Sequence, residues 1–72
     1  VYPNPIKELI FISHPSSNYF KVFISDLTGK VLLQKEVVKG EPINIENYSK
    51  GIYLVKVTTE DKQTNTYKII KQ

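Results

Sequence analysis

The sequence predicts an all-β domain built from antiparallel strands. Apolar residues alternate with polar ones in several short runs, and turn-forming residues separate these runs about every ten residues. No apolar stripe with helical spacing and caps is present, so the crossover helices that parallel strands need are not expected. Short strands with hairpin-length links favour a small immunoglobulin-like β-sandwich of six to seven short strands. A five-stranded oligonucleotide-binding barrel is the alternative fold.

The first two expected strands are residues 9–13 and 19–26. Residues 9–13 are apolar on both faces, which predicts a central or covered strand. In residues 19–26, Phe20, Val22 and Ile24 share one face of the strand, while Lys21 and Ser25 lie on the other. One face of this second strand is therefore expected to meet the core.

A tight turn is expected between the second strand and a third strand at residues 31–38. The side chain of Asp26 can accept a hydrogen bond from the backbone two residues on, and Gly29 can adopt positive φ. Gly51, like Gly29, is expected at a backbone position that a side chain would strain, and Asn4 is expected to form a turn, as Asp26 does. We interpret these four residues as structural.

Three further strands complete the prediction, at residues 43–46, 52–60 and 66–71. Pro42 lacks a backbone donor, so residues 43–46 are expected to form a short edge strand. Residues 52–60 form the longest β-rich run and are expected to be the central strand.

Composition excludes several classes of protein. The 72 residues fit one domain with a thin core, and the absence of cysteine excludes disulfides and a cysteine-based zinc site. The net charge is +3, yet all ten basic residues are lysines spread along the chain, which favours a solvated surface over a nucleic-acid site. No apolar run is long enough to span a bilayer. The absence of an initiator methionine predicts a fragment of a longer polypeptide.

Catalytic and cofactor-binding patterns are missing from the sequence. The single histidine, His14, stands beside Pro15 in a predicted turn, which favours a solvated loop residue. A catalytic triad with Ser16 or Ser17 would also need an orienting acid and an oxyanion hole. The seven carboxylates form no acid–base pair and no calcium loop, and no glycine-rich phosphate loop occurs. We therefore expect no enzyme activity, no metal and no cofactor.

Four short motifs follow one another along the chain: Tyr2-Pro3-Asn4-Pro5, Asp26-Leu27-Thr28-Gly29-Lys30, Gly51-Ile52-Tyr53-Leu54-Val55-Lys56-Val57 and Lys68-Ile69-Ile70-Lys71. Their order and spacing resemble the type A C-terminal sorting domain of the type IX secretion system, the Por secretion tail family. The resemblance covers essentially all 72 residues.

This resemblance implies that the domain is a targeting signal for secretion. Residues 1–72 would form a single C-terminal sorting domain of a larger cargo protein, which reaches the periplasm of a Gram-negative bacterium by the general export route. The outer-membrane translocon would recognise the domain, and a sortase-like surface protease would remove it, at a site expected upstream of residue 1. The cargo would be released or anchored at the cell surface, and the domain itself would insert stably into no membrane.

The terminal strand and the longest strand supply the candidate contacts with the translocon. The terminal strand is expected to be exposed at the end of the chain remote from the cargo, so a partner could read its surface or pair with its edge. The candidate recognition residues are Tyr53, Val55, Lys68, Ile69, Ile70 and Lys71.

Two binding functions remain as alternatives. A carbohydrate-binding or adhesive β-sandwich module of an extracellular enzyme would show a row of coplanar exposed aromatic rings on one face. A nucleic-acid-binding barrel would show clustered lysines around exposed aromatic rings and salt-dependent binding.

Overall fold

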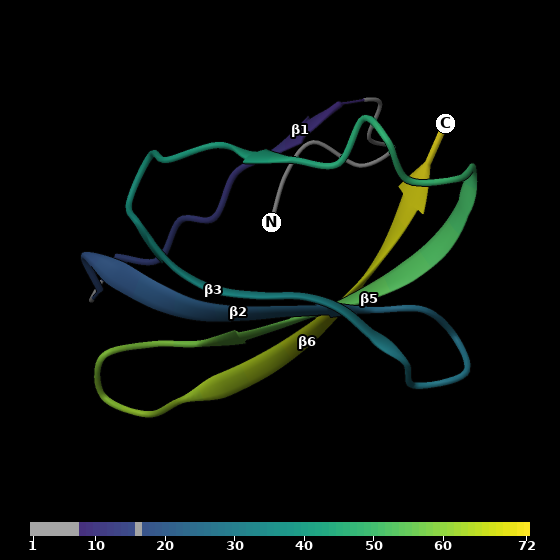
Figure 1. The fold of residues 1–72 in the computed structure, drawn as a ribbon. Coiled ribbons are helices and arrows are strands. Elements are labelled where there is room, and N and C mark those ends of the chain that lie inside the picture. The colour runs from purple at the N-terminus through teal and green to yellow at the C-terminus, as the bar shows by residue number, and fades with distance from the viewer. Residues whose placement is uncertain (1–7, 16) are drawn as a thin grey trace.

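The computed structural model describes residues 8–15 and 17–72, which form six strands in two antiparallel sheets. In chain order the strands are β1 (Leu9–Ile10), β2 (Tyr19–Ser25), β3 (Val31–Val38), β4 (Ile43–Asn44), β5 (Gly51–Thr58) and β6 (Thr64–Lys71). One sheet has the order β3-β2-β5-β6, and the other pairs β1 with β4. Figure 1 shows the smaller sheet lying over one face of the larger. The predicted all-β sandwich of immunoglobulin-like type is therefore confirmed, with two layers rather than a closed barrel.

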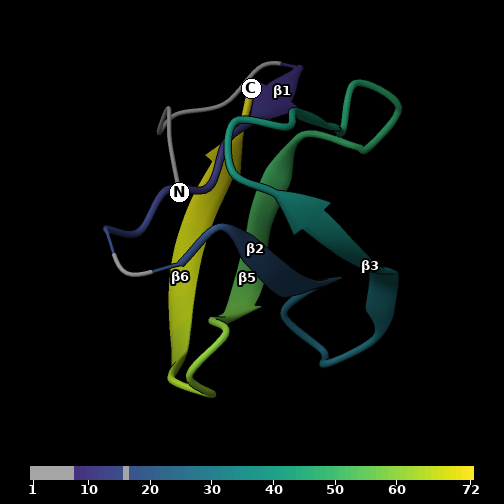
Figure 2. The same ribbon diagram turned by 90° about the vertical axis from the view of Figure 1, so that its left-hand side faces the viewer.

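No helix occurs among residues 8–15 and 17–72, so none of the described segments is a helix that could cross a membrane. Figure 2 shows the four strands of the larger sheet side by side, with β3 at one edge and β6 at the other.

The core lies between the two sheets, and strict alternation along β2 produces its centre. Phe20, Val22 and Ile24 are completely buried, as predicted, while Lys21 on the other face is exposed. The smaller layer contributes apolar side chains from β1, β4 and the residues next to them. The remaining core residues are Ile10, Ile12, Val37, Ile43, Ile45, Tyr53, Val55, Val57 and Ile69.

Two hairpins, β2–β3 and β5–β6, together with the pairing of β2 with β5 give the order of the larger sheet. Strand β5 pairs with β2 on one side and with β6 on the other, so the prediction that this run is central is confirmed. The register of β5 with β6 is regular from Gly51↔Lys71 to Thr58↔Thr64. The register of β2 with β3 shifts between Ile24 and Ser25, where Leu32 is the extra residue of a bulge.

The turn between β2 and β3 is built by the side chain of Asp26. Its Oδ1 accepts hydrogen bonds from the backbone N–H of Thr28 at 2.9 Å and of Lys30 at 3.1 Å, and from the Thr28 hydroxyl at 2.6 Å. Gly29 has a φ of +91°, in the region that side chains disfavour. Gly51 has a φ of +153° where β5 begins.

The strands of the smaller sheet are shorter than predicted. Residues 9–13 are predicted as one central or covered strand, but β1 ends at Ile10 and lies in the two-stranded sheet. Its partner β4 is also only two residues long and follows Pro42, which cannot donate to a ladder. Ile10 and Ile12 are nevertheless buried, so the segment is covered although it is not central.

A carboxylate that no sequence motif singles out joins two distant segments. Oε1 of Glu60, in the turn after β5, accepts hydrogen bonds from the backbone N–H of Asn18 at 2.6 Å and of Tyr19 at 3.2 Å. The buried hydroxyl of Ser17 accepts a bond from the Glu60 N–H at 2.9 Å and donates to the Tyr19 carbonyl, also at 2.9 Å. These contacts hold the start of β2 against the β5–β6 turn.

Replacing Glu60 with alanine is expected to lower the free energy of unfolding by about 1 kcal/mol, because two backbone donors lose a charged acceptor at an exposed site. In a domain of this size that loss corresponds to a melting temperature lower by roughly 4–8 °C. Thermal unfolding followed by circular dichroism measures it. Glu46→Ala is the control, since Glu46 is also an exposed carboxylate outside the strands. Equal melting temperatures for the two variants would contradict a stabilising role for Glu60.

Candidate recognition surface

The residues predicted to form turns occupy the ends of strands. Asp26 and Gly29 form the β2–β3 turn, and Gly51 begins β5. Asn4 lies outside the described residues. The assignment of these residues as structural stays a prediction.

The structure divides the six residues predicted to contact the translocon into two groups. Lys68 and Ile70 are exposed, and Ile70 retains 46% of its accessible surface. Tyr53, Val55, Ile69 and Lys71 are all buried, with at most 8% of their surface accessible. A partner of the folded domain cannot touch these four side chains directly, so the expectation that the whole terminal strand is exposed needs this correction.

The register of the hairpin explains the division. Tyr53 pairs with Ile69, and Gly51 pairs with Lys71, so these side chains share the inner face that β1 and β4 cover. Tyr53 is fixed further by a hydrogen bond that its hydroxyl donates to the Ser49 carbonyl at 2.6 Å. Its ring also packs against Tyr48, with centroids 5.5 Å apart. The inner residues therefore determine the shape of the domain.

The outer face of the larger sheet, directed away from β1 and β4, carries an ordered pattern of side chains. Lys21 pairs with Thr58, Phe23 with Lys56, Leu54 with Lys68 and Ile52 with Ile70. This register places side chains of one kind on diagonals that cross β2, β5 and β6. We call one diagonal the lysine stripe (Lys21, Lys56, Lys68) and the neighbouring diagonal the apolar stripe (Phe23, Leu54, Ile70).

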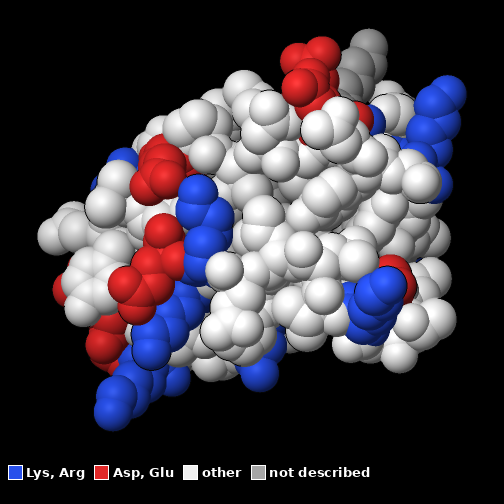
Figure 3. All heavy atoms as spheres, viewed as in Figure 1, with Lys and Arg blue, Asp and Glu red and all other residues white. Residues whose placement is uncertain are grey.

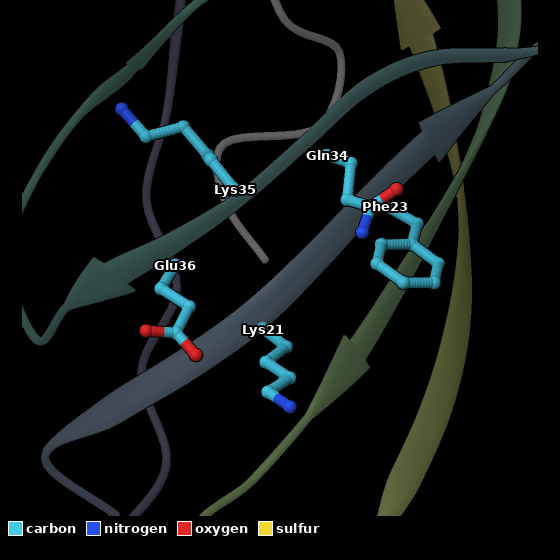
Figure 4. Close-up of a pocket in the computed structure, with 5 residues that line it drawn as sticks. All are labelled: Lys21, Phe23, Gln34, Lys35 and Glu36. Carbon is cyan, nitrogen blue, oxygen red and sulfur yellow. The ribbon is translucent and has the colours of Figure 1, made fainter.

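A shallow hollow of about 290 Å³ lies where the two stripes begin, on β2 and β3. Figure 4 shows Lys21, Phe23 and Glu36 beside it, with Lys35 extending away from them. Nζ of Lys56 lies 5.8 Å from the centroid of the Phe23 ring, within range of a cation–π contact. The hollow is open and shallow, so it can form part of a protein contact but does not enclose a small molecule.

The edge of β3 next to this hollow is protected by Glu41. Its Oε1 accepts a hydrogen bond from the Val38 N–H at 3.1 Å, and its Oε2 lies 3.4 Å from Nζ of Lys35. The bond from Val38, followed by the contact with Lys35, lowers the pKa of the Glu41 carboxyl below its ordinary value of 4.5. With the bulge at Leu32, this cap shortens the edge that another strand could join.

Charge is distributed unevenly over the surface. Figure 3 shows lysines and carboxylates gathered toward the end where β2 begins, whereas the centre of that view carries none. The exposed aromatic rings of Tyr19 and Tyr67 lie on opposite faces of the larger sheet, since Tyr67 pairs with the inward-facing Val55. Within the described residues, the row of exposed rings expected of a carbohydrate-binding module is therefore not formed.

The carboxylates with perturbed pKa belong to turns. The hydrogen bond from Thr28 lowers the pKa of Asp26, and the hydrogen bond from Thr59 lowers that of Asp61. In residues 8–15 and 17–72 no group of three or more His, Cys, Asp or Glu side chains could hold a metal ion. These carboxylates thus have structural partners. The candidate functional site is instead the outer face of the larger sheet, with its lysine stripe and apolar stripe.

Comparison with known proteins identifies the class of domain. A family model described as the secretion system C-terminal sorting domain matches residues 1–72. The chain belongs to this family. It is a sorting signal for type IX secretion, which confirms the function predicted from the four sequence motifs.

One relative of this sorting domain is Beta-agarase D of Zobellia galactanivorans, which is 33% identical to it over 70 residues. The match covers 97% of the sorting domain but only 14% of the relative. No solved structure matches the sorting domain. The family implies the type IX machinery and an attached cargo as partners, and secretion or the cell surface of a Gram-negative bacterium as the destination.

Proposed function

We propose that residues 1–72 act as one folded targeting signal. The outer-membrane translocon of the type IX system recognises this signal after the cargo has entered the periplasm by general export. A sortase-like surface protease then removes the domain upstream of residue 1, and the cargo is released or anchored. The domain acts as a targeting signal and not as an enzyme.

The observation that carries this proposal is the packing of the last strand. Ile69 belongs to the core cluster together with Ile10 of β1 and Ile43 of β4, and Lys71, two residues further on, is also buried. The C-terminal residues are thus an integral part of the sandwich. A receptor that requires them encounters a folded surface, which presents Lys68 and Ile70 from β6.

A periplasm-targeted fluorescent reporter with this chain at its C-terminus tests the proposal. In a bacterium with a working type IX system, the reporter is expected on the cell surface or in the medium. A translocon mutant is expected to retain it in the periplasm. A reporter without the chain is the control for leakage, and immunoblotting of the delivered reporter shows whether the domain has been removed.

Retention of the reporter in the periplasm of both strains would contradict the proposal. It would favour a binding module instead, and titrations with sugars and cell-wall material would then identify the ligand.

A further inference from the structure

We propose that the outer face of the larger sheet is the docking surface for an acidic, partly apolar protein surface of the type IX machinery, which contacts the lysine stripe and the apolar stripe together. The inference rests on the proposed function and assigns the contact to particular residues. It moves the expected contact from selected residues of β5 and β6 to the outer face of three adjacent strands, β2, β5 and β6.

The first argument is the order of the lysines. Each lysine of the stripe lies on a different strand. Lys56 is two residues from Thr58, which pairs with Lys21, and Lys68 is two residues from Thr66, which pairs with Lys56. Diagonal neighbours of this kind are about 7–8 Å apart, and side chains two residues apart on an extended strand are about 6.6–6.8 Å apart. An extended partner segment with carboxylates at alternate positions can therefore meet all three lysines.

The second argument is the apolar stripe beside them. Ile70 has 46% and the neighbouring Ile52 has 38% of its surface accessible, while Phe23 and Leu54 are half-buried. The smaller sheet covers only the inner face, so no described strand lies over these side chains. Contact with apolar side chains of a partner would remove this surface from water.

The third argument is charge complementarity. On the outer face of the four strands, Glu36 is the one carboxylate among the described residues, and it lies opposite Lys21 in the register. Three lysines against one carboxylate leave this face positive, and matching carboxylates on a partner would accelerate association and fix its orientation. The surface therefore fits an acidic partner.

The side chains favour a protein over a polysaccharide or a nucleic acid. Sugars and bases stack on open aromatic faces, but Lys56 lies over the Phe23 ring, and the other members of the apolar stripe are aliphatic. Aliphatic side chains flanked by lysines match a protein contact, with an apolar centre and a charged border.

Two charge-matched triple variants of the reporter fusion test the proposal. The first combines Lys21→Gln, Lys56→Gln and Lys68→Gln. The control replaces three exposed lysines outside the stripe: Lys30→Gln, Lys39→Gln and Lys50→Gln. We expect translocon-dependent delivery to fall about tenfold for the first variant, and to stay within about twofold of the unmodified chain for the control.

A separate variant, Leu54→Thr, tests the apolar stripe without changing charge and keeps a residue that favours strands. We expect it to reduce delivery in the same direction. Thermal unfolding of each fusion verifies that the domain remains folded, and only variants that melt within a few degrees of the unmodified domain are compared.

The outcomes separate this inference from the proposed function. If the unmodified chain delivers the reporter but the stripe variants equal the control, the docking surface is wrong and the sorting function stands. The docking surface is also wrong if both lysine triples lose delivery equally, or if the stripe variant is delivered normally but loses retention on an anionic polysaccharide. If the unmodified chain is not delivered, the sorting function fails and the docking surface fails with it.

Discussion

Phe20→Ala is expected to destabilise the domain by about 3–5 kcal/mol and to abolish delivery of an attached cargo. Phe20 is completely buried on β2, where it pairs with Val37 and faces the smaller sheet. Small domains have free energies of unfolding near the low end of about 5–15 kcal/mol, so the substitution removes much or all of the stability. Urea unfolding measures the loss, and the reporter assay measures delivery.

The control for this variant is Leu27→Ala, which also shortens a large apolar side chain. Leu27 lies in the β2–β3 turn with 62% of its surface accessible, so its replacement is expected to leave stability and delivery nearly unchanged. If Phe20→Ala unfolds the domain and the cargo is still delivered in full, the machinery reads an unfolded segment. The proposal that the domain is recognised as a folded targeting signal would then be wrong.

Local sequence pattern is sufficient to predict most of the larger sheet. Alternation in β2 identifies the buried face of Phe20, Val22 and Ile24, and Asp26 with Gly29 locates the first turn. Each of these features depends on neighbours in the chain. The early end of β1 escapes such a prediction because it depends on β4, a partner more than thirty residues away in the sequence.

The sequence alone does not determine on which face of the sheet each residue of β6 lies. The motif Lys68-Ile69-Ile70-Lys71 gives each face of a strand one lysine and one isoleucine, so its composition does not favour either orientation. Pairing with β5 makes the choice, because Tyr53 opposite Ile69 contributes to the core. Burial of Lys71, exposure of Lys68 and both stripes follow from that register, which only the three-dimensional structure supplies.

Removal of residues 68–72 is expected to reduce delivery of the cargo to the level of the reporter without a sorting domain. The truncation deletes Ile69 and Lys71 from the inner layer and leaves the first half of β5 without its partner. It also removes Lys68 and Ile70 from the outer face. Folding and recognition are thus both lost, and the reporter assay measures their combined effect.

Ile69→Ala separates these two effects, because it changes the inner layer and leaves every residue of the outer face in place. It is expected to cost about 2–5 kcal/mol of stability. Deletion of Gln72 alone, an exposed residue, is the control for the length of the chain.

If Ile69→Ala reproduces the loss seen with the truncation, packing of β6 determines delivery. If the truncated chain resists protease and is still not delivered, the last strand is read directly. Delivery of the truncated cargo in normal amounts would show that residues 68–72 are not needed, and the machinery would then have to recognise the part of the domain that remains.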